Sequence, residues 1–200
     1  MAQFISRKVP SKELINLTKK NLVLRVEQEA DIENGQASSL VEALLSAITD
    51  FVVEKKTVML TKIGGLTVSY KVGRPGRNLK TLESTEITPR YSVTLRTGSG
   101  KSNTNERVGQ PNIIKHTIDK LPNVHPKLVK VALDQLLAML EMVKEGTYRV
   151  EIRNFGVFYP SILPEGRKAR NPKTGQSVIA KRKVVIRYKC PESIKKSLNP

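Results

Sequence analysis

The chain has 200 residues and a formal net charge of +17 at pH 7. This excess favours a polyanionic partner, because clustered Lys and Arg release condensed counterions when they meet phosphates. The single cysteine, Cys190, excludes an intramolecular disulfide and a thiolate-rich zinc site. No apolar run approaches the roughly 20 residues of a membrane span, and the N-terminus lacks the apolar region of a signal peptide. We therefore expect a soluble intracellular protein with no membrane partner.

A short motif occurs twice and predicts a duplicated unit. Residues 76–82 read Gly-Arg-Asn-Leu-Lys-Thr-Leu, and residues 169–175 read Ala-Arg-Asn-Pro-Lys-Thr-Gly. A unit of about 90 residues buries only a modest core alone, so we expect the two copies to pack together around one core. The expected organisation is an N-terminal extension at 1–17, a first repeat at 18–97, a flexible linker at 98–110 and a second repeat at 111–200.

The first half begins with an extension whose residues fit a short strand and a helical extension equally. Apolar periodicity then predicts two helices, near Lys19–Ala30 and Ser38–Val53, the second with a stripe of Leu40, Leu44, Ile48 and Phe51. Ser39 and Glu42 have the spacing of a capping box at the start of the second helix. β-Prone runs predict strands at about 57–61, 66–72 and 91–96.

The polar segment that follows predicts the linker. Its residues Ser99-Gly100-Lys101-Ser102 resemble part of a phosphate-binding loop. Position 95 is Leu where such a loop has its first glycine, and no apolar helix follows, so the linker interpretation is favoured.

The second half repeats the plan. A short helix at about 113–121 ends at Pro122-Asn123, and a longer one begins at Pro126 and stops at Gly146. Two antiparallel strands with an extended hairpin are expected over Tyr148–Tyr188. A last short helix at 192–198 has no counterpart in the first half. The fold class is α+β, with helix, helix, three strands and an extended hairpin in each copy.

Basic residues gather on both predicted hairpins and their flanking strands, and they are the candidate binding residues. A charged two-stranded ribbon of this kind can lie along a nucleic-acid groove and contact both phosphate walls. The alternative is a solvated face that protects a sheet edge from aggregation, but acidic residues are sparse on the same segments. The cations are Lys71, Arg74, Arg77, Lys80, Arg90 and Arg96 in the first copy, and Arg167, Lys168, Arg170, Lys173, Lys181, Arg182, Lys183, Arg187 and Lys189 in the second.

The hairpin tips carry candidate apolar wedges. Pro172 presents a rigid ring between cations, and such a ring can enter a minor-groove base step and kink the duplex. Asn-Pro alone is more often a simple turn, but the Arg before it and the Lys-Thr-Gly after it favour the wedge. Leu79 occupies the equivalent position without the preset φ of proline, and Leu82 replaces the glycine that would ease the turn. The first tip is therefore expected to be the weaker one.

These residues resemble the HU and integration host factor family of bacterial DNA-bending proteins, present here as two copies in one chain. The resemblance runs over about Thr18–Arg96 and Pro111–Asn199, and its most specific parts are Arg170 to Gly175 at the hairpin tip and the turn at 155–158, Phe-Gly-Val-Phe. Family members are usually intertwined dimers with helices below and two β-arms above. The resemblance therefore implies an intramolecular pseudo-dimer that works as a monomer.

The resemblance also implies roles for single residues. Pro172 would be the intercalating wedge, with Arg170, Asn171 and Lys173 as its groove and phosphate contacts. Arg77, Asn78 and Lys80 would act in the same way around Leu79. The first copy departs from the family pattern in four features, which are Leu79, Leu82, Ile63 in place of the turn aromatic, and the missing closing helix. An asymmetric bend of the DNA or a smaller binding footprint is therefore an open alternative to a symmetric bend.

The expected function is architectural and non-catalytic, with double-stranded DNA as partner and no small-molecule substrate, metal or cofactor. His116 and His125 lack the spacing of a metal site or a nucleophile–base pair and fit helix-surface or capping positions. The alternative is a structural or assembly protein whose first copy is a protein-binding platform. An RNA-binding role has less support, because aromatic residues are 4% of the chain. The expected location is the cytoplasm, associated with the nucleoid, or the virion or host cytoplasm for a viral source.

Overall fold

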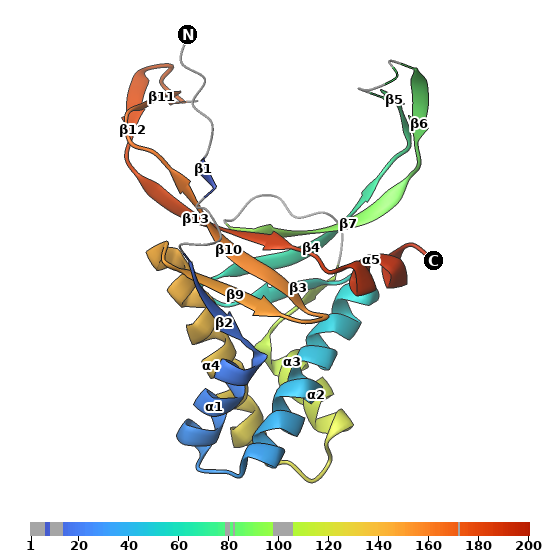
Figure 1. Cartoon of the computed structure of the whole chain (residues 1–200), viewed down its shortest axis with the longest axis vertical. Helices are drawn as coiled ribbons and strands as arrows, with labels where there is room; N and C mark the ends of the chain where they lie inside the picture. The colour runs from blue at the N-terminus through green and yellow to red at the C-terminus, as the bar shows by residue number, and fades with distance from the viewer. Residues whose placement is uncertain (1–6, 9–13, 79–80, 82, 98–105, 172) are drawn as a thin grey trace.

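The structure is a computed structural model that describes residues 7–8, 14–78, 81, 83–97, 106–171 and 173–200. Figure 1 shows helices in a lower layer, β-sheets above them and two β-hairpins that project from the sheets on the side away from the helices. The mixed α+β class and the tandem arrangement agree with the sequence prediction.

The first half of the chain contains two helices, which are α1 (Lys19–Ala30) and α2 (Asn34–Val53). Its strands are β2 (Ile15–Thr18), β3 (Thr57–Leu60), β4 (Gly64–Lys71), β5 (Arg74–Arg77), β6 (Ser84–Ile87) and β7 (Arg90–Arg96). The N-terminal extension, which the sequence left open, contributes two short strands, β1 (Arg7–Lys8) and β2.

The second half has the same order of elements, with one helix added at its end. Its helices are α3 (Gln110–Lys120), α4 (Pro126–Glu141), the 3-10 turn η2 (Met142–Glu145) and α5 (Glu192–Leu198). Its strands are β8 (Arg107–Val108), β9 (Tyr148–Ile152), β10 (Gly156–Leu163), β11 (Arg167–Arg170), β12 (Ser177–Ala180) and β13 (Lys183–Lys189).

The predicted start of α2 is wrong by four residues. Asp31 ends α1 in the left-handed conformation, with φ 50°, and α2 begins at Asn34 after a short connection. Ser39 therefore lies inside the helix, where its hydroxyl donates to the carbonyl of Gly35 at 3.0 Å instead of capping an N-terminus. A capping box does occur at α1, where the backbone N–H of Thr18 donates to Oδ1 of Asn21 at 2.8 Å.

The helices of the two halves share one hydrophobic core. Helix α1 packs on α4, α2 packs on α3, and α2 packs on α4, so the contacts among these four helices are symmetric between the halves. Leu44 of α2 and Leu136 of α4 occupy equivalent positions, and each has no exposed surface. Burying such a side chain contributes about 1.5–3 kcal/mol. The expectation that the halves pack around one core is confirmed.

Helix α2 also corrects an expectation about membranes. By length and composition it is apolar enough to cross a bilayer, although no such run was expected from the sequence. Half of that stretch is buried in the protein, including Leu40, Leu44 and Ile48. An apolar core helix meets the same length and composition test.

Each sheet is completed by a strand from the other half. Strand β2 precedes α1 but pairs in parallel with β9, with Leu17 opposite Val150. Strand β8 precedes α3 but pairs in parallel with β3, with Val108 opposite Val58. The strand orders are β1-β10-β9-β2, with β13 also on β10, and β7-β4-β3-β8. This exchange ties the halves together independently of the helix contacts.

Residues 107–110 therefore differ from the linker expectation. Val108 is 1% exposed in β8, and α3 already begins at Gln110. The segment 98–105, including the phosphate-loop-like residues at 99–102, lies outside the described residues.

The turn that leads from the first to the second strand of each sheet has the same geometry in both halves. Gly64 and Gly156 have φ of 137° and 130°, and each follows a buried apolar residue, Ile63 or Phe155. A Cβ on Gly64 would lie 2.4 Å from the carbonyl oxygen of Arg96, and one on Gly156 would lie 2.5 Å from the Tyr188 ring. Only glycine lets the neighbouring strand approach this closely.

Candidate nucleic-acid interface

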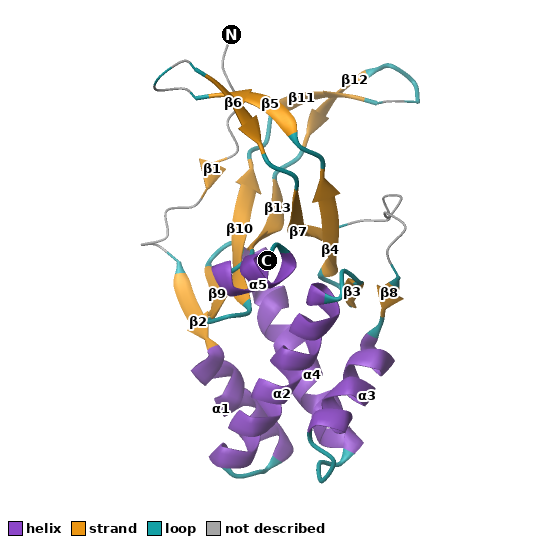
Figure 2. Cartoon of the chain, turned by 90° about the vertical axis from the view of Figure 1, so that its right-hand side faces the viewer, coloured by secondary structure: helices purple, strands orange, loops and turns teal. Residues whose placement is uncertain are grey.

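Two β-hairpins extend the sheets beyond the body of the protein (Figures 1 and 2). The first arm, residues 72–89, continues β4 and β7 and contains β5 and β6, with Arg77 opposite Ser84. The second arm, residues 164–182, continues β10 and β13 and contains β11 and β12, with Arg170 opposite Ser177. Both arms project from the same side of the molecule, so they can contact one ligand together.

The candidate binding side chains that the structure describes lie mostly at the surface of the arms. Asn171 is half-buried. Those exposed on the arms are Arg74, Arg77 and Asn78 on the first and Lys168, Arg170, Lys173, Lys181 and Arg182 on the second. Those exposed on the strands that flank the arms are Lys71, Arg90, Arg96, Lys183, Arg187 and Lys189. Leu79, Lys80 and Pro172 lie outside the described residues, as does the side chain of Arg167, so the two wedge assignments stay predictions.

The tip of the second arm is closed by its own motif. The backbone N–H of Asn171 donates to the carbonyl of Gln176 at 2.9 Å, and that of Gly175 donates to the carbonyl of Asn171 at 2.8 Å. The side chain of Asn171 accepts from the N–H of Lys173 at 3.0 Å, and Nε of Arg170 donates to the carbonyl of Gly175 at 2.9 Å. Gly175 has φ 71°. These contacts explain why the motif needs Asn and Gly at these positions.

The two arms differ strongly in charge. The second arm has six Lys and Arg residues and one Glu, a net charge of +5, whereas the first has three and two, a net charge of +1. Glu83 and Glu86 are both exposed on the first arm. The first arm thus departs from the expectation that acidic residues are sparse on both arms.

A further group of cations lies on the flank of the body, and of its members only Lys189 was among the candidates predicted from the sequence. It surrounds a surface groove of about 700 Å³ that Glu151 and Glu192 also line, and its members are Lys19, Lys20, Arg149, Arg153, Lys189 and Lys195. Arg149 donates to Glu151 at 2.6 Å, and Lys195 donates to Glu192 at 3.1 Å. We call this group the cationic flank.

The opposite flank has a different set of charges, because Arg96 and Arg107 stand where the cationic flank has Lys189 and Asn16. The strand registers place Thr57, Met59 and Thr61 where the cationic flank has Arg149, Glu151 and Arg153. The pairing of β2 with β9 brings residues near 19 beside residues near 150. Local clusters in the sequence do not reveal the cationic flank, because its residues come from distant segments. The positive charge outside the arms was the one signal for it.

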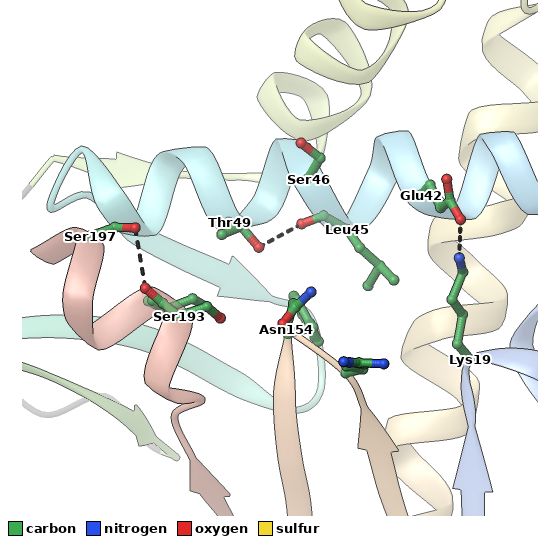
Figure 3. A pocket seen from close by; sticks show the side chains of 11 residues that line it. Lys19, Glu42, Leu45, Ser46, Thr49, Asn154, Ser193 and Ser197 are labelled. Atoms are coloured by element: carbon green, nitrogen blue, oxygen red, sulfur yellow. Dashed lines mark hydrogen bonds and ion pairs between the residues drawn. The ribbon is translucent and has the colours of Figure 1, made fainter.

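A groove between α2, α5 and the β9–β10 turn, of about 440 Å³, is another hollow near this flank (Figure 3). Two of its hydroxyl groups bond within their own helices, since Thr49 donates to the carbonyl of Leu45 at 2.8 Å and Ser197 to that of Ser193 at 3.2 Å, and the Ser46 hydroxyl accepts from Lys120 at 2.7 Å. Lys19 and Glu42 form an ion pair at one end. No nucleophile and base converge among these side chains.

The histidines and the cysteine occupy structural positions. His125 caps α4, accepting from the N–H of Lys127 at 3.2 Å, and His116 on α3 contacts Asp50 at 3.0 Å, as expected for capping and helix-surface residues. Burial raises the pKa of the Cys190 thiol, which keeps it protonated. In the part of the chain that the structure describes, no group of three or more His, Cys, Asp or Glu side chains could hold a metal ion.

The sequence matches one protein family twice. The model of a family described as "Bacterial DNA-binding protein" matches residues 17–103 and again residues 110–199. The chain belongs to this family. Its two matched segments correspond to the two halves of the fold, so the tandem HU and integration host factor-like arrangement is established.

Individual relatives match about one half of the chain each. Integration host factor subunit alpha of Hahella chejuensis is 37% identical over 82 residues, 41% of this chain and 82% of the relative. The subunit alpha of Jannaschia sp. is 35% identical over 80 residues, 40% of this chain and 80% of the relative. That of Marinomonas sp. is 35% identical over 83 residues, 42% of this chain and 85% of the relative. One DNA-binding family unit is therefore similar in length to one repeat of this protein.

Proposed function

We propose that this protein binds duplex DNA without catalysis, grips it between the two arms and bends it by inserting apolar tip residues. The observation that carries the proposal is the pair of arms on one shared base, with exposed cations on the second arm, which projects away from the helices. Cations on a ribbon of this kind fit the phosphate walls of a groove. Membership of a DNA-binding family supports the same partner.

Bending requires a wedge as well as charge. Pro172 and Leu79 are the proposed wedges, and unstacking a base step costs a few kcal/mol that the added backbone contacts along the bent duplex offset. Because the base already holds both arms, the two repeats, at 18–97 and 111–200, act as one unit, and a monomer is the proposed binding species. The description of the family as bacterial favours the nucleoid as the site of action.

The experiment compares the native chain with Pro172→Ala and Leu79→Ala on a duplex of about 35 base pairs labelled at its ends with a donor and an acceptor dye. Pro172→Ala is expected to lower the bend angle more than the affinity, because charge holds the complex and the wedge shapes it. Leu79→Ala is expected to have the smaller effect. Unchanged transfer efficiency in both variants would refute the wedge roles. Binding that did not weaken with added salt would refute the electrostatic part.

A second candidate function is a protein-binding platform formed by the first half. The near-neutral first arm and the uncharged residues Thr57 and Thr61 on the flank of the first half favour it. Under this alternative, neutralising the cations of the second arm leaves the activity of the protein intact. If the protein bends DNA, the same change abolishes its activity.

A further inference from the structure

The last helix belongs to the second half by sequence but to the first by packing. Helix α5 packs against α2 and β7, and its residues Ile194 and Leu198 are each 3% exposed. Figure 1 shows α5 on the side of the body from which β5 and β6 rise. The C-terminal end of the chain therefore lies at the root of the first arm.

One side chain after this helix holds the backbone of β7 at two points. The N–H of Tyr91 donates to Oδ1 of Asn199 at 2.6 Å, and Nδ2 of Asn199 donates to the carbonyl of Tyr91 at 3.2 Å. A residue's N–H and C=O face the same side of an antiparallel strand. Because β7 is an edge strand that pairs with β4, these bonds occupy its outer edge. The Asn199 amide takes the place of a neighbouring strand.

The clamped residue sits where the arm leaves the body. Tyr91 is the second residue of β7, and the first arm ends at Pro89. The Tyr91 ring also packs against Tyr70 on the paired strand, with centroids 5.0 Å apart, and Nζ of Lys55 lies 4.1 Å from its centre. A fixed backbone at this position sets the direction in which the arm departs.

The second arm is held in a different way. Val184 is the second residue of β13 and pairs with Ile162, so it is the equivalent of Tyr91. No described side chain makes the matching pair of hydrogen bonds to Val184. At the root of the second arm, it is the other strand, β10, that is held. Strand β1 pairs with it opposite Ser161 and Ile162. The two ends of the chain therefore brace opposite arms.

We propose that Asn199 is a positioning residue that fixes the direction of the first arm before DNA is bound. The first arm has a net charge of only +1 and attracts phosphate weakly. Holding the arm in place reduces the ordering cost that binding would otherwise carry. This benefit rests on the proposed function, whereas the clamp itself is a property of the free protein.

A purely local role for Asn199 makes a different prediction. Its Nδ2 also donates to the carbonyl of Lys195 at 3.0 Å, so the side chain caps α5 as well. If capping were its whole role, its loss would loosen the C-terminal residues and leave the first arm unchanged.

The test measures arm position in the full chain without DNA, by pulsed electron paramagnetic resonance between two spin labels. One label is placed on the body by Asp134→Cys, and the second on the first arm by Thr85→Cys or on the second arm by Ser177→Cys. All three positions are exposed, whereas Cys190 is buried and escapes labelling. Each pair is compared in the parent and in Asn199→Ala, with Ser197→Ala as the matched control, because that hydroxyl bonds only within α5.

Asn199→Ala is expected to widen the distance distribution of the first arm and to leave that of the second arm unchanged. The amide exchange of Tyr91 should accelerate roughly tenfold, because its acceptor is lost. Asn199→Asp keeps the acceptor but loses the donor, and should show an intermediate width. Ser197→Ala should match the parent.

An unchanged first arm in Asn199→Ala, or equal widening of both arms, would overturn the proposal. Duplex binding is then measured on the same proteins. A widened first arm in a protein whose parent fails to bind DNA would sustain the clamp and refute the proposed function. If the protein binds and bends DNA but Asn199→Ala does not widen the distance distribution of the first arm, the proposed function stands and the clamp is refuted.

Discussion

The two arms are copies of one hairpin, yet they differ in charge, tip and support. The second carries a net charge of +5 and a proline-containing tip, and the first carries +1 and leucine at the matching position. The core beneath them diverges less, since Leu44 and Leu136, like Val58 and Val150, match in residue type and burial, and Ile63 and Phe155 differ in size but are both buried. Close packing restricts what a core position can accept, whereas a solvated surface does not. The duplicated unit has thus kept a symmetric base and acquired unequal surfaces.

The symmetry of the base is tested by truncating equivalent core residues. Leu44→Ala and Leu136→Ala should each lower the free energy of unfolding by about 2–5 kcal/mol, because each leaves a cavity in the shared core. Urea unfolding followed by circular dichroism measures both. Two separate transitions, or a loss confined to one variant, would contradict a single core.

The inequality of the arms is tested by neutralising each in turn. Lys168, Arg170, Lys173 and Lys181 are changed together to Gln, and Arg74 and Arg77 are changed together in a second protein. The slope of log affinity against log salt should fall by about 0.9 for each lost phosphate contact, hence by up to ~3.6 in the first protein and ~1.8 in the second. Fluorescence anisotropy of labelled duplex measures the slopes. Equal slopes would show that the charge difference has no consequence for binding.

The inequality of the flanks is tested by one substitution on each side. Arg153→Gln removes a cation from the cationic flank and should lower the salt slope by about 0.9 on a duplex long enough to reach it. Lys62→Gln alters the turn residue at the neighbouring position of the other half, and is expected to leave the slope unchanged. If Lys62→Gln lowered the salt slope more than Arg153→Gln, the duplex would lie on the flank of the first half and not on the cationic flank.

The smallest expected effect on stability comes from a difference between the two equivalent helix contacts. At the α2–α3 contact, Asp50 accepts from Lys120 at 2.6 Å and contacts His116 at 3.0 Å. At the α1–α4 contact, Arg25 instead donates to the sulfur of Met142 at 3.1 Å. Burial raises the pKa of Asp50, but the bonds from Lys120 and His116 outweigh it and hold that pKa below its ordinary 3.8.

A lowered carboxyl pKa adds stability above the ordinary value and loses it as the pH falls through the folded-state value. Asp50→Asn should therefore lower the stability by less than ~1 kcal/mol near neutral pH, since the pair is partly exposed. The difference from the parent should shrink as the pH falls below 3.8 and disappear below the folded-state pKa of Asp50. Thermal unfolding across pH 2.5–7 measures it. A difference that grew on acidification would contradict the assignment.

Local patterns in the sequence predicted the helices, their apolar stripes and the hairpins, because each depends on residues close together in the chain. The stripe at Leu40, Leu44 and Ile48 is buried as predicted. The start of α2 was missed because Ser39 has the pattern of a cap but lies one turn inside the helix.

Contacts between distant segments left no local signal. The exchange of β2 and β8, the docking of α5 on the first half and the assembly of the cationic flank all join residues far apart in the chain. Among candidate site residues, Lys168 and Arg170 are exposed, and their contact with a nucleic acid stays a prediction. The roles of Pro172 and Leu79 stay predictions.

One chain, with two arms on a fused base, is proposed to bend one duplex. Energy transfer between dyes at the two ends of a duplex of about 35 base pairs, titrated with the native chain at low salt, tests it most directly. Transfer should rise and reach a plateau at one chain per duplex. Saturated binding with no rise in transfer, or a rise that requires two chains, would contradict the account.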